Sequence, residues 1–203
     1  MRSNELVLRT LVDAALGGTR RWDNAGDLAF EAGVPESSAY LTLNRLSSIG
    51  AATKYASGGF ALVSVDKALT LLCAARNLEK DTLARTTVAG VQPFLDTAGG
   101  PYALGGPDAA NVHLSGWHVS DFSEHLVYLP ESRLAGADLP EGEEVRVIAM
   151  DRRAARKWTG YSSVAQTYAD LFATPGWAAS EFRIAMREKL LHEREWDQKD
   201  AHA

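Results

Sequence analysis

Residues 24–62 read NAGDLAFEAGVPESSAYLTLNRLSSIGAATKYASGGFAL, and this stretch decides how the N-terminal part of the chain folds. Asn24 can cap a short helix, and Gly33 can end it because glycine readily adopts the left-handed conformation that follows many helices. Pro35 then fits the start of a second helix, where its missing N–H leaves no hydrogen bond unmade. The inward side of this second helix is marked by apolar residues at helical spacing, namely Ala39, Leu43, Leu46 and Ile49.

A hairpin is predicted directly after the second helix. Residues 51–55 and 60–63 have strand character, and Gly58-Gly59 between them suits a tight turn. A winged helix-turn-helix has this order of helix, tight turn, helix and hairpin, and it places its second helix in the major groove of DNA. We therefore predict a winged helix-turn-helix domain over residues 1–66.

The outer side chains of this domain are the predicted DNA contacts, because hydroxyl, amide and guanidinium groups can hydrogen-bond base edges and phosphates. Along the second helix they are Ser37, Ser38, Tyr40, Leu41, Thr42, Asn44 and Arg45. Near the hairpin tip they are Lys54, Tyr55 and Ser57, and before the short helix they are Arg20 and Arg21. Two alternatives stay open: the helix face is merely solvated, and Tyr55 packs across the hairpin.

Two further helices are predicted around this domain. Residues 4–16 carry apolar side chains at three-and-four spacing and end at a glycine pair, and residues 66–87 repeat the pattern behind Asp66. We expect the second of these helices to connect the domain of residues 1–66 with a C-terminal domain of residues 67–203. Cys73 lies on its apolar side, which predicts a buried thiol and not a nucleophile.

Composition limits the class of protein. The 203 residues are 46% hydrophobic, enough for one large or two small folded domains. The net charge is −5, and residues 1–66 are close to neutral, with six Lys/Arg and seven Asp/Glu. A single cysteine excludes a disulfide framework within the chain and favours a reducing compartment. Because no secretory signal or long apolar run is visible, we expect a cytoplasmic protein without a membrane span.

The C-terminal part mixes strands and helices. Strands are predicted near residues 101–106, 125–129 and 145–150, and helices near residues 107–114, 163–173 and 176–195. This mixture indicates a small α/β domain, so that the whole chain is predicted to be α+β.

Three segments of the C-terminal part read YALGGPDAANVH (102–113), HLVYLP (125–130) and SSVAQTYADLFATPGWAASEFRIAMREKLL (162–191). Behind a winged helix, these segments resemble the AbiEi-type antitoxin and transcriptional-regulator family, most of all in residues 164–171. The resemblance implies a C-terminal domain related to the nucleotidyltransferase fold. It also implies an autoregulatory repressor that binds operator DNA; whether a toxin protein is its partner is left open.

Nucleotide transfer is the enzymatic alternative that the glycine turn at Gly105-Gly106 raises. Nucleotide transfer needs a glycine turn for the triphosphate and two carboxylates, two residues apart on the next strand, to hold Mg²⁺. Gly105-Gly106 meets the first need, but Glu124 has only Asp121, three residues away, which would not share its strand face. The five histidines show no metal-ligand spacing. We therefore predict a degenerate fold with no catalytic residues, no metal and no cofactor, and nucleotide transfer is the lesser alternative.

One basic cluster, made of Arg152, Arg153, Arg156 and Lys157, stands out in the acidic C-terminal part. It is either an auxiliary phosphate patch, a contact for an acidic partner, or a solvated helix turn. The sequence as a whole predicts a sequence-specific, DNA-binding transcriptional regulator that is not an enzyme and that binds double-stranded DNA as two copies. The near-neutral charge of residues 1–66 keeps a winged-helix protein-interaction module as the alternative.

Overall fold

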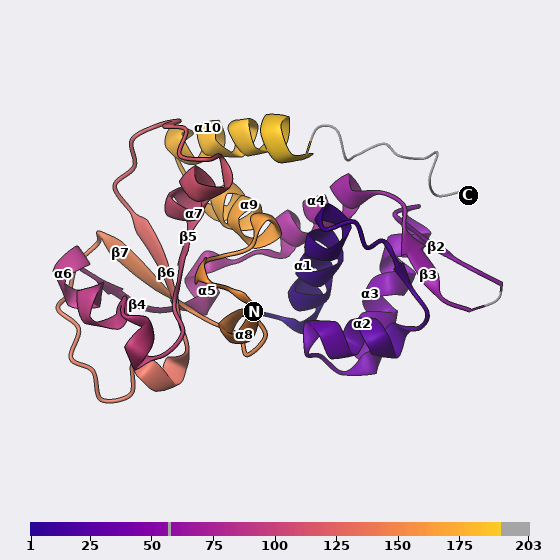
Figure 1. The fold of residues 1–203 in the computed structure, drawn as a ribbon, viewed down its shortest axis with the longest axis horizontal. Helices are drawn as coiled ribbons and strands as arrows, with labels where there is room; N and C mark the ends of the chain where they lie inside the picture. Colours follow the sequence, from indigo (N-terminus) through magenta and orange to yellow (C-terminus); the bar gives the residue numbers. More distant parts are fainter. Residues whose placement is uncertain (57, 192–203) are drawn as a thin grey trace. The chain divides into compact units, whose positions relative to one another are not determined.

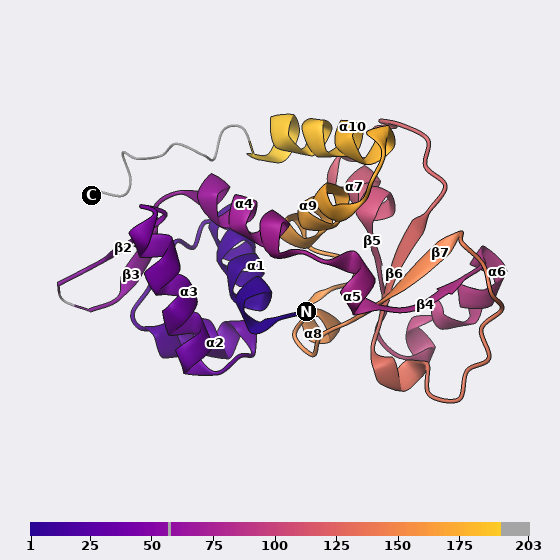
Figure 2. The same ribbon diagram turned by 180° about the vertical axis from the view of Figure 1, so that it is seen from behind.

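The computed structural model describes residues 1–56 and 58–191, and its ribbon is drawn in Figures 1 and 2. Helices and two separate sheets confirm the mixed α+β class. The described chain forms two compact units, Met1–Arg76 with Arg187–Leu191, and Asn77–Met186. Within the described ranges, every helix is too short or too polar to cross a bilayer.

Over its described residues up to Arg76, the first unit contains four helices and a small antiparallel sheet with the strand order β1-β3-β2, and the short π-helix η4 (Arg187–Leu191) also belongs to it. Its elements are α1 (Ser3–Leu16), β1 (Arg21–Trp22), α2 (Ala25–Ala32), α3 (Glu36–Ser48), β2 (Ala52–Lys54), β3 (Phe60–Leu62) and α4 (Val65–Ala75). Helix α1 packs against the other three helices. Leucines from each helix, among them Leu11, Leu28, Leu46 and Leu72, are fully buried, so one apolar core holds α3 in place.

The tight turn before α3 forms as its sequence predicts. The side chain of Asn24 accepts a hydrogen bond of 2.8 Å from the backbone N–H of Asp27 and caps α2. Gly33 ends α2 with φ 70° and ψ 39°, the left-handed conformation. Pro35 is the N-cap of α3 and not its first helical residue. These local features fix the angle at which α3 leaves α2.

The hairpin is anchored by aromatic stacking and by one glycine. Lys54 of β2 pairs with Phe60 of β3, whose ring stacks on that of Trp22 with centroids 5.4 Å apart. Gly59 has φ 79°, and a Cβ there would lie 2.7 Å from the carbonyl oxygen of Trp22. The tip residue Ser57 lies outside the described residues.

Gly59→Ala should therefore destabilise the hairpin more than Gly58→Ala. Both glycines have a positive φ, which costs alanine about 1–2 kcal/mol, but Gly58 has nothing within 4 Å of an added Cβ. At Gly59 the clash with Trp22 adds an overpacking cost on the order of 1–3 kcal/mol. Hydrogen exchange of the amides in residues 52–62 measures the difference. Equal exchange rates in the two variants would show that the close approach of Gly59 to Trp22 of β1 does not affect the stability of the hairpin.

The helix predicted over residues 66–87 is wrong beyond residue 75. Helix α4 is capped by Ser64 and ends at Ala75, after which Asn77 caps the short α5 (Leu78–Asp81). The chain then enters β4 (Thr82–Thr86), whose first and last residues are β-branched threonines, a residue type that favours a strand. Along the chain, the boundary between the two units accordingly falls between Arg76 and Asn77, whereas the sequence analysis divides the chain between residues 66 and 67.

The second unit is built on a five-stranded mixed sheet with the order β4-β7-β6-β5-β8. Its other strands are β5 (Ala103–Gly105), β6 (His125–Leu129), β7 (Val145–Ala149) and β8 (Gly160–Tyr161). Its longer helices are α7 (Gly106–His113), α9 (Val164–Ala173) and α10 (Trp177–Met186), and its short α-helices are α5, α6 (Val88–Val91) and α8 (Ala154–Lys157). Helices α7, α9 and α10 pack together beside the sheet, as both ribbon views show.

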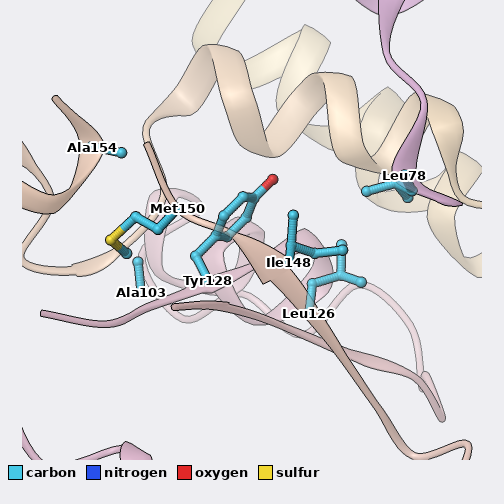
Figure 3. Packing of buried hydrophobic residues seen from close by; sticks show 7 residues of the cluster. All are labelled: Leu78, Ala103, Leu126, Tyr128, Ile148, Met150 and Ala154. Carbon is cyan, nitrogen blue, oxygen red and sulfur yellow. The ribbon is translucent and has the colours of Figure 1, made fainter. Parts of the chain in front are cut away.

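The two faces of this sheet have separate cores. Leu126, Tyr128 and Ile148 belong to one cluster, with Met150 and Leu78 (Figure 3). Alternate residues of the same strands, Val127, Leu129, Val145 and Val147, belong to a second cluster with Val91 of α6. Because side chains alternate along a strand, β6 and β7 bury residues on both faces and are the centre of this unit.

Candidate nucleic-acid interface

Helix α3 and the hairpin present one polar surface in the first unit. Tyr40 and Leu41 are 52% and 69% exposed, and Arg45 and Lys54 are exposed beside the half-buried Asn44. We call these five residues the α3–hairpin face. Their opposite neighbours Ala39, Leu43 and Leu46 are buried as predicted, although Ile49 at the helix end is 40% exposed. The rigid core beneath α3 therefore holds this face outward.

Lys54 joins the hairpin to α3. Its Nζ donates a hydrogen bond of 2.6 Å to Asn44 Oδ1 and lies 4.7 Å from the centroid of the Tyr40 ring. Tyr40 and Asn44 are four residues apart and so lie on one side of α3. A hydrogen bond and a cation–π contact thus fix the three side chains relative to one another.

The remaining predicted contacts differ in their surroundings. Arg21 of β1 is exposed, and its guanidinium carbon lies 5.6 Å from the centroid of the Tyr55 ring. Arg20 precedes β1 and is half-buried. Ser37 is exposed and Ser38 half-buried in the first turn of α3. Ser57 is predicted to be a contact but lies outside the described residues.

Thr42 was expected on the outer side of the second helix, and that expectation is wrong. Its side chain is 6% exposed, and its hydroxyl donates a 2.9 Å hydrogen bond to the backbone carbonyl of Ser38. The threonine hydroxyl hydrogen-bonds to the preceding turn of its own helix, which is common for threonine within helices. Thr42 therefore belongs to the inner side of α3 and has no group directed at a ligand.

Charges of both signs are spread over the first unit. Four of the six basic residues of residues 1–66 lie on or beside the sheet and α3, namely Arg20, Arg21, Arg45 and Lys54, and Asp23 and Glu36 lie in the same part. The other two, Arg2 and Arg9, lie at α1 together with Glu5 and Asp13. The α3–hairpin face itself carries two cations, Arg45 and Lys54, and no acidic residue.

The basic cluster of the second unit surrounds a short capped turn. Asp151 Oδ1 accepts hydrogen bonds of 3.0 Å from the backbone N–H groups of Arg153 and Ala154. Helix α8 begins only at Ala154, so Arg152 precedes it. Arg152, Arg156 and Lys157 are exposed and Arg153 is half-buried. This cluster can meet an anion, but the geometry of its side chains alone does not select one.

Packing accounts for the glycine turn that resembles a triphosphate site. A Cβ on Gly105 would lie 2.8 Å from Tyr128 Cε2, and one on Gly106 would lie 3.0 Å from Leu126 Cδ1. Gly106 also has φ 52° at the start of α7. The close approach of β6 therefore requires both glycines without reference to a phosphate.

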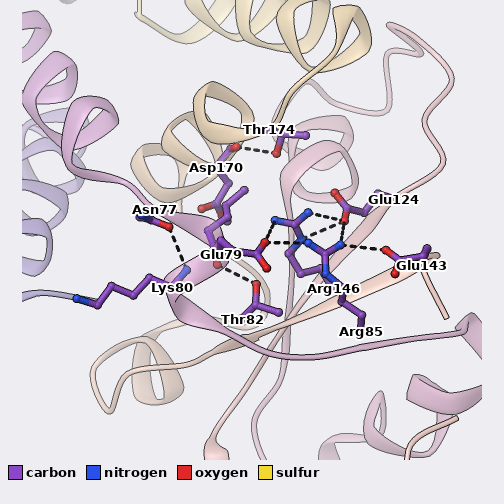
Figure 4. A network of polar contacts seen from close by, with 11 residues as sticks. Asn77, Glu79, Lys80, Thr82, Arg85, Glu124, Glu143, Arg146, Asp170 and Thr174 are labelled. Atoms are coloured by element: carbon purple, nitrogen blue, oxygen red, sulfur yellow. Dashed lines mark hydrogen bonds and ion pairs between the residues drawn. The ribbon is translucent and has the colours of Figure 1, made fainter. Parts of the chain in front are cut away.

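Glu124, the candidate metal-binding carboxylate, is held by arginines (Figure 4). Its Oε1 accepts a 2.8 Å hydrogen bond from Arg146 Nη2 and lies 3.4 Å from Arg85 Nη1. Burial lowers the pKa of Arg85, but the hydrogen bond and charge of Glu79, with the charges of Glu143 and Glu124, raise it above the ordinary value. Over residues 1–56 and 58–191, no three His, Cys, Asp or Glu side chains are grouped to hold a metal ion.

A buried polar cluster in α9 was missed by the sequence analysis. Asp170 is fully buried, and it accepts hydrogen bonds of 2.6 Å from the Tyr128 hydroxyl and 2.9 Å from Gln166 Nε2. Thr167 is also fully buried, and its hydroxyl lies 2.8 Å from that of Ser162. Gln166 and Asp170 are four residues apart in an apolar helix, and this spacing was the available signal. Together they tie α9 to the centre of the sheet.

Comparison with known protein families, with curated proteins and with solved structures found no match to this chain. The arrangement of side chains is therefore the basis for assigning a function.

Proposed function

We propose that the first unit is a winged helix-turn-helix and that the protein is a sequence-specific, DNA-binding transcriptional regulator. The observation that carries the proposal is the α3–hairpin face. It combines a helix of 13 residues, Glu36–Ser48, with exposed donors from Arg45 and Lys54 and an apolar contact from Leu41. An exposed helix of this kind fits the major groove, where arginine, asparagine and apolar side chains read base edges.

Fluorescence anisotropy tests the proposal. It measures, at several salt concentrations, how tightly the protein binds a labelled DNA duplex taken from upstream of the protein's own reading frame. Arg45→Ala should weaken binding and lower the slope of log affinity against log salt by about one unit if Arg45 meets a phosphate. Lys80→Ala is the matched control, because Lys80 is an exposed cation on α5 of the second unit. An Arg45→Ala slope equal to that of the wild-type and Lys80→Ala proteins would refute the phosphate contact.

For the second unit we propose a degenerate nucleotidyltransferase-like fold without enzymatic activity, in a regulator of the AbiEi type. The packing role of Gly105 and Gly106 and the ion pairs of Glu124 support a structural use of the residues that an enzyme would need. We further propose that the protein represses its own gene in the cytoplasm, with two copies bound to DNA and a toxin protein as the candidate partner. Two copies fit because one short helix reads few base pairs.

A second candidate function is a protein-interaction module. The exposure of Tyr40 and Leu41 supports it, because large exposed apolar side chains also suit a protein partner. The anisotropy experiment separates the candidates. Binding that depends on both salt and DNA sequence favours the regulator, and no binding to any duplex favours the module.

A further inference from the structure

The hydrogen-bonding direction of Asn44 is fixed by Lys54. A lysine ammonium group has three donors and no acceptor, so only the carboxamide oxygen of Asn44 can face it at 2.6 Å. The Asn44 Nδ2 group must then point to the other side of the carboxamide. Within the part of the chain that the structure describes, no acceptor is assigned to this Nδ2 group.

This orientation changes what Asn44 can read. An asparagine selects adenine by accepting from N6–H and donating to N7 at the same time. Asn44 Oδ1 still has a second lone pair, but an adenine amino group that approached it would lie beside the Lys54 ammonium, donor against donor. Guanine has acceptors at both N7 and O6, and each can receive a hydrogen bond from one member of the pair.

We infer that Asn44 and Lys54 act as one unit of two donors that selects guanine over adenine in the major groove. The inference rests on the proposed DNA-binding function and names the base that this part of the α3–hairpin face recognises. Lys54 belongs to the hairpin and Asn44 to α3. In this proposal the hairpin therefore helps to select the base, because it orients the Asn44 side chain of α3, in addition to contacting the DNA backbone. The Tyr40 ring beneath the ammonium keeps Lys54 in place when Asn44 meets a base.

Selection of bound duplexes from a random pool by the full chain tests this inference. Asn44→Ala should lose the preference at one position, which identifies the base that Asn44 reads. The wild-type protein should prefer guanine there. Lys54→Met should prefer adenine, because the Asn44 carboxamide is then free of the lysine and can both donate and accept. Lys54→Arg keeps the donors and should keep guanine. Lys67→Met is the matched control, since Lys67 Nζ donates to the carbonyl of Ile49 and not to Asn44.

The selected duplex with 7-deazaguanine at that position gives a second measurement. Loss of the N7 acceptor should weaken wild-type binding about tenfold, and it should weaken binding by Asn44→Ala less, because that variant has already lost one of the two donors. The inference is overturned if wild type and Lys54→Met select the same base, or if wild type selects adenine at that position. If the wild-type chain binds or enriches no duplex at all, the proposed function itself is overturned. That result differs from an unchanged base preference, which overturns only the inference about Asn44 and Lys54.

Discussion

Asp170→Ala should destabilise the second unit by about 2–6 kcal/mol, because it leaves two buried donors without an acceptor and each such donor costs about 1–3 kcal/mol. The substitution leaves the Tyr128 hydroxyl and the Gln166 amide without the carboxylate that accepts their hydrogen bonds. It also removes side-chain volume from a site that is fully buried. Because Tyr128 lies on the central strand β6, the loss should loosen the attachment of α9 to the sheet.

Hydrogen exchange followed by mass spectrometry measures this effect, because peptides from each unit are observed separately. Exchange should accelerate in residues 125–129 and 164–173 and stay unchanged in α1 to α3. Tyr128→Phe removes one hydrogen bond to a charged group and should cost about 1.5–3 kcal/mol. Asp138→Ala is the control, because Asp138 is exposed. The structural role fails if Asp170→Ala exchanges like Asp138→Ala.

Local sequence signals predicted the cap and the end of α2 and most of the buried side of α3. Asn24, Gly33 and the apolar spacing of α3 each act within a few residues, so their effects can be read without knowing the fold. Where the prediction is wrong, nearby residues favour a different local structure or hydrogen bond. Asn77 and the β-branched Thr82 and Thr86 interrupt the long helix, and the hydroxyl of Thr42 bonds back to its own helix.

The interactions of the candidate site could not be predicted in the same way. Lys54 and Asn44 are ten residues apart and meet only because the hairpin register aims Lys54 at α3. Tyr128 and Asp170 are 42 residues apart, and their hydrogen bond depends on how α9 packs on the sheet. Sequence patterns therefore identify which residues are polar and outward, whereas tertiary packing decides which of them act together.

Leu41→Glu should reduce the affinity for duplex DNA about 100-fold or more without unfolding the protein. Leu41 is 69% exposed in the middle of α3, so its loss removes little from the core. A carboxylate at this position would face the phosphates and the electronegative edges of the groove, and like charges brought together at an interface cost several kcal/mol. Fluorescence anisotropy with the selected duplex measures the affinity, and circular dichroism checks the fold.

Val112→Glu is the matched control for this change. Val112 is 47% exposed on α7 of the second unit, so the variant adds the same charge in place of an exposed apolar side chain. It should bind DNA as wild type does, apart from a small loss from the added net charge. If Leu41→Glu binds as tightly as Val112→Glu while Arg152→Ala with Arg156→Ala abolishes binding, DNA would dock on the basic turn before β8. In that case α3 would be free for a protein partner, and the assignment of the α3–hairpin face as the reading surface would be wrong.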